Sequence, residues 1–177
     1  MEKFNVPAKA EVSANNQAIF DKLTAGVGFV PNLYATMAYS DTALGNYLQF
    51  QGGKTSFSNK EKEVINLAVS QANECRYCQS AHTAIAKMNG FTDEQAIELR
   101  QGFSSWDSKL DALSKMSKSV AENKGKVDSE TLNAFFEVGY TKGSMVDLIV
   151  LVGDKTVMNF LHNLTQVEID FPESIEL

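Results

Sequence analysis

The sequence has no excess of basic residues. Its 177 residues include 16 Lys and Arg against 22 Asp and Glu, which gives a formal net charge of -6. Proteins that bind nucleic acids neutralise phosphates with a basic surface, and anionic membranes attract the same kind of surface. We therefore expect neither a nucleic-acid partner nor a membrane partner. The acidic residues are spread along the chain, which favours a role in solubility.

Long apolar runs and targeting signals are also missing. No stretch approaches the roughly 20 apolar residues that span a bilayer, and the densest one, Val146 to Val152, contains Asp147. Residues 1–7 show no basic region followed by an apolar run, so the sequence predicts no secretory signal. From these absences we expect a cytoplasmic protein.

Proline is scarce, with three residues, and the chain contains only two cysteines. Few segments alternate apolar and polar residues, whereas apolar residues recur at helical spacing along most of the chain. A chain of this length buries about 70% of its unfolded surface, so it needs neither a metal nor disulfides to fold. We predict an all-α fold that forms a single domain over residues 1–177, without tandem repeats or a linker.

Capping residues and glycines mark where the helices should begin and end. Ser58 with Glu61, and Thr92 with Gln95, have the spacing of capping boxes. The expected helices follow the polar stretch 13–16 and end near Gly26 and Gly28, begin at Pro31, run from Ser40 or Asp41 to Gly52, and then cover 58–72, 75–89, 92–99, 107–120, 128–136 and 144–164. The last of them is apolar nearly all round at 148–152, which predicts burial in the core or in a subunit interface.

The segment 75–78, which has the form Cys-X-X-Cys, indicates a function. Cys75 and Cys78 are three residues apart and His82 follows four residues later, so the three side chains share one face of a helix. The sulfurs are close enough to form a disulfide, and a helix N-terminus favours the thiolate, with thiol pKa values of roughly 3.5 to 7.5 in such settings. An imidazole, which has a pKa of about 6.5, can take the thiol proton. The pattern predicts a redox site, and apolar neighbours on the same helix suit a hydrophobic peroxide.

Three other interpretations of the cysteine pair stay open. The cysteines could be inert core residues. The pattern C-x2-C-x3-H with Glu63 could hold zinc, although structural zinc sites draw further ligands from a distant segment and the only other histidine is His162. A thioredoxin-like oxidoreductase expects the motif after a strand, and this sequence predicts no strands.

Spacing alone gives no clear role to Glu63 or to His162. Glu63 lies away from most of the apolar side of its predicted helix, so the default interpretation is a solvated carboxylate. His162 lies among apolar residues of the last helix, which favours a packed or interface residue.

A glutamate twelve positions before the first cysteine, the cysteine pair and the following histidine together resemble the alkylhydroperoxidase D-like (AhpD-like), carboxymuconolactone decarboxylase superfamily. The glutamate is part of that signature, and this gives Glu63 a candidate role. Residues 28–34, 159–163 and 169–172 are similar to the flanking segments of the superfamily's peroxidase-related branch. The likeness therefore covers most of the chain.

The resemblance implies an all-helical AhpD-like fold, assembly into homo-oligomers (commonly trimers or hexamers), and thiol-dependent reduction of hydroperoxides. Carried over residue by residue, it makes Cys78 the peroxidatic cysteine and Cys75 the resolving one, with Glu63 and His82 as a proton relay. In the best-studied members a histidine precedes the second cysteine, and here Tyr77 takes that place. A phenol, which has a pKa of about 10, is a poor base at neutral pH. This leaves Tyr77 to orient a water or donate a hydrogen bond.

The resemblance also implies no tightly bound cofactor and no metal. An external dithiol, either a lipoyl group or a thioredoxin-like protein, is expected to reduce the Cys75–Cys78 disulfide. Two alternatives remain. The first is a redox sensor or disulfide-exchange protein with little peroxidase turnover. The second is a decarboxylase-like lyase, which is less favoured because that branch lacks the cysteine pair.

Overall fold

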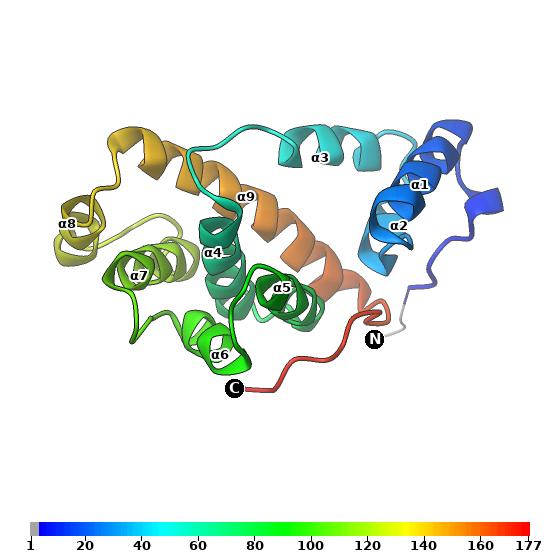
Figure 1. The fold of residues 1–177 in the computed structure, drawn as a ribbon. Helices are drawn as coiled ribbons and strands as arrows, with labels where there is room; N and C mark the ends of the chain where they lie inside the picture. Colours follow the sequence, from blue (N-terminus) through cyan, green and yellow to red (C-terminus); the bar gives the residue numbers. More distant parts are fainter. Residues whose placement is uncertain (1–3) are drawn as a thin grey trace.

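The structure is a computed structural model that describes residues 4–177, and within that range the chain is helical, with no strand (Figure 1). The prediction of an all-α fold is confirmed for these residues. Part of the segment tested for a secretory signal, residues 1–3, lies outside them. The elements are the 3-10 turn η1 (Lys9–Glu11) and the helices α1 (Ala14–Val27), α2 (Asn32–Met37), α3 (Ala43–Gln51), α4 (Asn59–Ala72), α5 (Arg76–Met88), α6 (Asp93–Gln101), α7 (Ser108–Glu122), α8 (Ser129–Glu137) and α9 (Lys142–Thr165).

Most helices begin where the predicted caps place them. At α4 the Ser58 hydroxyl accepts the N–H of Glu61 at 3.3 Å, and the Glu61 carboxylate accepts the N–H of Ser58 at 2.9 Å. Thr92 and Gln95 form the same reciprocal arrangement at α6. These capping boxes satisfy N–H groups that have no partner inside the helix. Pro31 is the residue just before α2 rather than its first residue.

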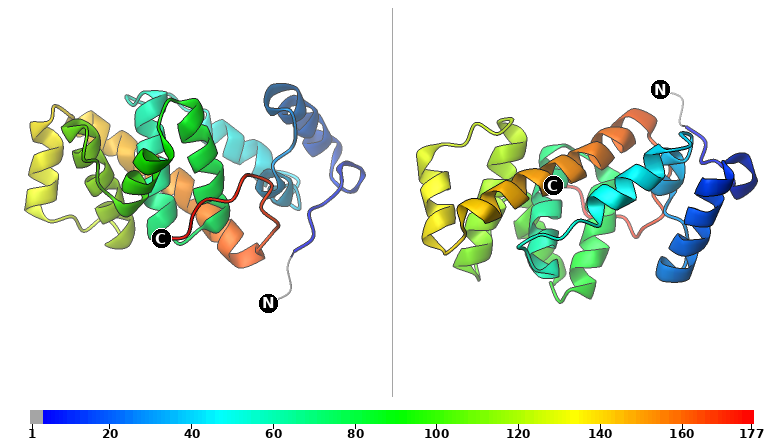
Figure 2. Two further views of the ribbon diagram at one scale, coloured as in Figure 1. Left: turned by 60° about the horizontal axis from the view of Figure 1, so that its bottom comes forward. Right: turned by 90° about the horizontal axis from the view of Figure 1, so that it is seen from above.

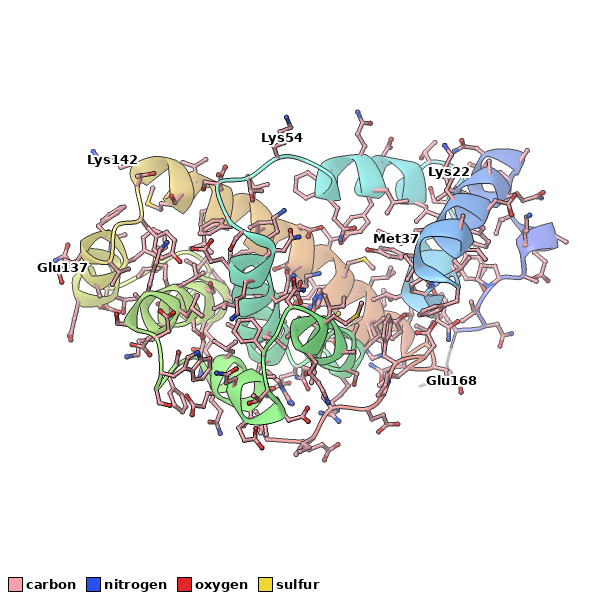
Figure 3. The ribbon with its side chains drawn as sticks, viewed as in Figure 1. Lys22, Met37, Lys54, Glu137, Lys142 and Glu168 are labelled. Carbon is pink, nitrogen blue, oxygen red and sulfur yellow. The ribbon has the colours of Figure 1, made fainter. Side chains whose placement is uncertain are left out.

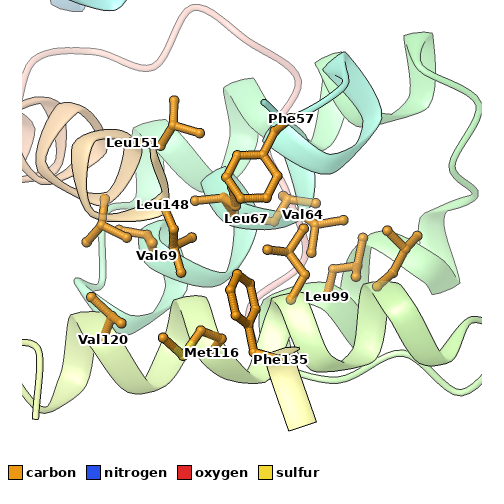
Figure 4. Close-up of a cluster of buried hydrophobic side chains, with 14 of the residues drawn as sticks. Phe57, Val64, Leu67, Val69, Leu99, Met116, Val120, Phe135, Leu148 and Leu151 are labelled. Atoms are coloured by element: carbon orange, nitrogen blue, oxygen red, sulfur yellow. The ribbon is translucent and has the colours of Figure 1, made fainter. Parts of the chain in front are cut away.

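Helix α4 lies at the centre of the fold. It packs against α5, α6, α7 and α9 (Figure 1), and its residues 63–70 are all buried. The largest apolar cluster surrounds it and contains side chains from α4, α7, α8 and α9 (Figure 4). This helix therefore has no solvent-facing side over its middle, and any polar side chain there is inside the protein.

Helix α9 is the longest helix and runs along the molecule (Figure 2). Its predicted burial over 148–152 is correct for Leu148, Leu151 and Val152, whereas Ile149 and Val150 are exposed. Only one side of α9 is covered by the rest of the chain. Within the described residues, none of the helices is long and apolar enough to cross a membrane.

A buried arginine holds the irregular C-terminal tail, residues 166–177, against the helices. The Arg100 guanidinium donates to the side-chain oxygens of Gln71 and Gln79 at 2.9 and 3.1 Å and to the carbonyl of Ile175 at 2.7 Å. Burial lowers the pKa of Arg100 to about 10, with help from the charge of Arg76, so the side chain stays charged at neutral pH. The tail is thus fixed beside the helix that carries the cysteines.

Replacing Arg100 by methionine should lower the free energy of unfolding by about 3 kcal/mol, because Gln71, Gln79 and the Ile175 carbonyl lose a buried charged donor. Urea denaturation measures this change. The matched control is Lys22→Met on the exposed side of α1 (Figure 3), which should change the stability by less than about 0.5 kcal/mol. An equally small effect for Arg100→Met would show that the tail contributes nothing to the fold.

Candidate active site

The cysteine pair lies at the N-terminus of α5. Cys75 is the N-cap residue, and its Sγ accepts the N–H of Cys78 at 3.2 Å. This bond turns the Cys75 side chain over the first turn of the helix, towards Cys78. Both cysteines are free thiols, and their exposed fractions are 0% for Cys75 and 3% for Cys78. The reactive groups are therefore shielded from bulk water.

The turn between α4 and α5 is fixed by α9. Glu74 has a φ of 55°, in the left-handed region that non-glycine residues seldom adopt. The Asn73 amide donates to Asn159 Oδ1 at 3.0 Å, and the Asn163 amide donates to the Asn73 carbonyl at 2.7 Å. Two side chains of α9 thus hold the segment that sets the position of Cys75.

The two thiols differ in acidity. Burial raises the pKa of both, and the pKa of Cys75 stays well above its ordinary value, also because of the neighbouring Cys78. At Cys78 burial is outweighed by a hydrogen bond from the Cys75 thiol, the charge of Lys155 and the amide of Asn159, so the pKa of Cys78 is lowered. Cys78 is the member of the pair that ionises more readily.

Glu63 and His82 lie together beside the cysteines. Glu63 Oε2 is 2.8 Å from His82 Nδ1, and Glu63 Oε1 accepts the amide of Asn66 at 3.0 Å. Glu63 is only 6% exposed. Its interpretation as a solvated carboxylate, which spacing favoured, is wrong, because α4 is covered on all sides at this level. Spacing within one helix does not reveal such coverage.

The electrostatics assign a proton to one nitrogen of His82. Burial lowers the pKa of His82, the charge of Lys155 lowers it further, and Glu63 only partly opposes this, so the imidazole is neutral at pH 7. Burial raises the pKa of Glu63, but His82, Lys155 and Asn66 outweigh it and hold the carboxyl ionised. A carboxylate accepts hydrogen bonds, so Nδ1 carries the imidazole proton. Nε2 is then the basic nitrogen, one turn of α5 beyond Cys78.

Two charged residues of the site were missed by the sequence analysis. Asp154 and Lys155 are adjacent on α9 and both are buried, with Lys155 only 3% exposed. Lysine and aspartate are rarely buried unless they are paired. Their signal in the sequence is two neighbouring charges inside an otherwise apolar helix. Lys155 is the cation that acts on the Cys78 thiol, Glu63 and His82.

Tyr77 points to the C-terminal tail. Its hydroxyl donates to Asp170 Oδ1 at 2.6 Å and accepts the N–H of Leu33 at 3.3 Å, while Asp170 Oδ2 accepts the N–H of Asn32 at 2.8 Å. Burial and Asp170 raise the pKa of Tyr77. The Tyr77 ring packs on buried His162, at 5.4 Å between ring centroids. The three flanking segments, 28–34, 159–163 and 169–172, thus meet at Tyr77, which anchors them to α5.

Within residues 4–177, no three His, Cys, Asp and Glu side chains are grouped so that they could hold a metal ion. The zinc interpretation needed both cysteines, His82 and Glu63 as ligands. Instead, His82 Nδ1 faces Glu63, and the Sγ of Cys75 accepts a backbone N–H. These contacts fit a hydrogen-bonded proton relay beside a thiol pair.

The segment that contains this site matches a known protein family. Residues 38–102, which contain the cysteine pair, Glu63 and His82, match the model of the carboxymuconolactone decarboxylase family. No curated protein sequence matches the chain. A likeness to solved structures extends over nearly the whole chain.

Three of those structures illustrate the likeness. The AhpD core of a peroxidase-related protein from Ralstonia eutropha JMP134 is 20% identical, with a TM-score of 0.84 over 95% of this chain and 92% of that one. A peroxidase-related protein from Silicibacter sp. TM1040 is 18% identical, with a TM-score of 0.81 over 93% and 90%. A cysteine-to-alanine variant of the debrominase Bmp8, in complex with 2,3,4-tribromopyrrole, is 15% identical, with a TM-score of 0.77 over 96% and 93%. The fold is thus AhpD-like, and it serves more than one reaction.

Proposed function

We propose that this chain, whose residues 38–102 match the carboxymuconolactone decarboxylase family and whose fold is AhpD-like, is a thiol-dependent hydroperoxide reductase. The observation that carries this proposal is the asymmetry of the thiol pair. The pKa of Cys78 is lowered, and the Cys75 sulfur accepts the backbone N–H of Cys78 at 3.2 Å. A peroxidatic cysteine needs a thiolate, and a resolving cysteine needs to be close to it.

The first step is attack on the peroxide. His82 Nε2 takes the thiol proton of Cys78 while Glu63 holds the proton on Nδ1. The Cys78 thiolate attacks one oxygen of the O–O bond, so that an S–O bond forms and the O–O bond breaks. His82 returns the proton to the leaving alkoxide, which departs as an alcohol. Cys78 is oxidised to a sulfenic acid and the hydroperoxide is reduced.

The second step closes the disulfide and the third restores the thiols. The Cys75 sulfur attacks the sulfur of the Cys78 sulfenic acid, so that an S–S bond forms, the S–O bond breaks and water leaves. An external dithiol, such as a lipoyl group or a thioredoxin-like protein, then reduces the disulfide through a mixed disulfide and supplies the two electrons.

The surroundings of the thiols favour an organic hydroperoxide as substrate. Leu33, Tyr47 and Met158 pack with the two cysteines in one buried cluster. An apolar organic group gains free energy on entering such surroundings, whereas hydrogen peroxide does not. We therefore expect cumene hydroperoxide to react faster than hydrogen peroxide.

The decisive experiment follows peroxide consumption by the wild-type protein with cumene hydroperoxide and dithiothreitol, with mass spectrometry of the cysteine peptides in the same samples. We expect repeated turnover and, without dithiol, one Cys75–Cys78 disulfide for each peroxide consumed. A disulfide that forms without turnover would instead indicate a redox sensor or a disulfide-exchange protein. If the protein formed no disulfide and showed no turnover, the proposed reductase activity would be refuted.

The buried cation gives a prediction about pH. Replacing Lys155 by methionine should raise the pKa of Cys78, because a positive charge that favours the thiolate is lost. At a fixed pH below that pKa, less thiolate is present and the rate falls, by about tenfold for each pKa unit. The rising limb of the pH–rate profile therefore moves to higher pH, and the rate recovers there.

Lys142→Met, at the exposed start of α9 (Figure 3), is the matched control and should leave the profile unchanged. If Lys155→Met lowers the rate equally at every pH, Lys155 supports the structure and does not stabilise the thiolate.

A further inference from the structure

One face of α9 is exposed and carries no charge. From position 146 to position 164, every exposed residue of this helix is apolar or glycine. These residues, called the α9 face below, are Val146, Ile149, Val150, Gly153, Val157, Phe160 and Leu164. Its six large side chains are between 42% and 65% exposed. The solvent side of a helix normally carries charged and polar residues, so this face differs from an ordinary surface.

The charged residues of this stretch are turned away from the α9 face. Lys155 is buried on the opposite side, Asp154 is buried beside the face, and Asp147 accepts the N–H of Ser56 at 2.7 Å. Membrane-surface helices, by contrast, are rich in lysine and arginine on the side next to their apolar face. The α9 face therefore fits a protein partner whose contact surface is also uncharged.

Six of the seven positions of the α9 face, all except Ile149, have a spacing with two-fold symmetry. Positions 146, 150, 153, 157, 160 and 164 are separated by four, three, four, three and four residues, which is the seam of a helix that packs against another helix. The intervals read the same in both directions. Two such helices in antiparallel orientation therefore bring every seam position opposite another seam position.

We propose that the α9 face binds the α9 face of a second copy of this chain, with the two helices antiparallel about a two-fold axis. Such a pair brings Val146 opposite Leu164, Val150 opposite Phe160 and Gly153 opposite Val157. A larger side chain faces a smaller one in each pair. A parallel arrangement would bring Phe160 against Phe160 and Gly153 against Gly153, which packs less evenly. The contact is the same on both partners, as in most homodimers.

The size and the charge of the face agree with a second copy as the partner. About half of the surface of six large side chains amounts to roughly 500 Å² per copy, so the pair would bury about 1,000 Å², where specific interfaces begin. The chain has a net charge of -6, so two copies repel one another over most of their surface. The uncharged α9 face allows contact without bringing carboxylates together.

This pairing is independent of the proposed function, because oligomer mass and peroxide turnover are measured separately. Lys155 and Asn159 lie on the buried side of the same helix. The thiol chemistry could therefore fail its test while the pairing holds, and the reverse is equally possible.

Sedimentation equilibrium of four proteins tests the pairing. The wild-type protein should have a mass that is an even multiple of 19.4 kDa. Val150→Lys and Phe160→Glu each place an unpaired charge in the contact and should weaken association by at least about 100-fold. The double variant places the two opposite charges across from each other and should restore association. Ten residues separate the two positions, so they are not neighbours within one helix.

Met88→Glu, at an exposed apolar position of α5, is the matched control and should keep the wild-type mass. Circular dichroism verifies that each variant is folded. Phe160→Ser, which adds no charge, replaces any charged variant that fails to fold. The pairing is overturned if the wild-type protein is a monomer or an odd-numbered oligomer at micromolar concentration, or if the single variants keep its mass. It is also overturned if the double variant stays dissociated.

Discussion

Replacing Cys78 by serine is expected to abolish peroxide turnover, with a loss of at least about 1,000-fold, because a serine hydroxyl provides no nucleophilic anion at neutral pH. Replacing Cys75 by serine should have a different effect. The Cys78 thiolate can still attack the peroxide, but no thiol at its side resolves the sulfenic acid. Without dithiol, the Cys75→Ser protein should therefore consume one equivalent of peroxide and stop.

The two variants are compared by the amplitude of the first round of peroxide consumption in a rapid-mixing experiment without dithiol. We expect one equivalent per chain for Cys75→Ser and none for Cys78→Ser. Both substitutions are nearly isosteric at buried positions, and thermal unfolding of each variant is the control for an altered fold. The reverse pattern, one equivalent for Cys78→Ser and none for Cys75→Ser, would exchange the roles of the two cysteines.

Replacing His82 by glutamine should lower kcat/KM at pH 7 by about 100- to 1,000-fold, because no base then takes the Cys78 proton. The loss should be largest at low pH and should shrink as the pH rises, since Cys78 ionises without help once the pH approaches its own pKa. Glu63→Gln should have a smaller effect of the same kind. An amide oxygen still accepts the Nδ1 proton, but it lacks the charge that favours a protonated imidazole.

A pH–rate profile between about pH 5 and 9 separates a proton-transfer role from a structural one. A loss of equal size at every pH would mean that His82 only supports the fold, and the relay would be wrong. Glu137→Gln, at an exposed position of α8 (Figure 3), is the control and should leave the profile unchanged.

The sequence predicted the helices well because their ends are marked by local interactions. Ser58 with Glu61, and Thr92 with Gln95, cap α4 and α6 as expected, since a capping box involves only residues three positions apart. Burial was predicted less well. The chain itself covers the apolar stretch of α9 on one side only, because the number of neighbours around a helix depends on the whole fold, and the expected place of this stretch in a subunit interface stays a prediction.

The same limit explains the errors at the candidate site. Glu63 was interpreted as solvated from its helical position, yet four other helices pack around α4. Lys155 was missed because nothing near it in the sequence indicates that α9 crosses the junction of α4 and α5. The family resemblance named Glu63 and His82, and the 2.8 Å contact between them joins residues nineteen positions apart. Only the tertiary structure shows that the charge of Lys155 acts on this pair.

The most direct test of the peroxidatic role of Cys78 treats reduced Cys75→Ser protein with one equivalent of cumene hydroperoxide in the presence of dimedone, which traps sulfenic acids. Intact-mass and peptide mass spectrometry then locate the adduct. We predict one dimedone adduct per chain, on Cys78, with release of one equivalent of the alcohol. An unmodified Cys78 with the peroxide left unconsumed would contradict the assignment of this thiolate as the group that breaks the O–O bond.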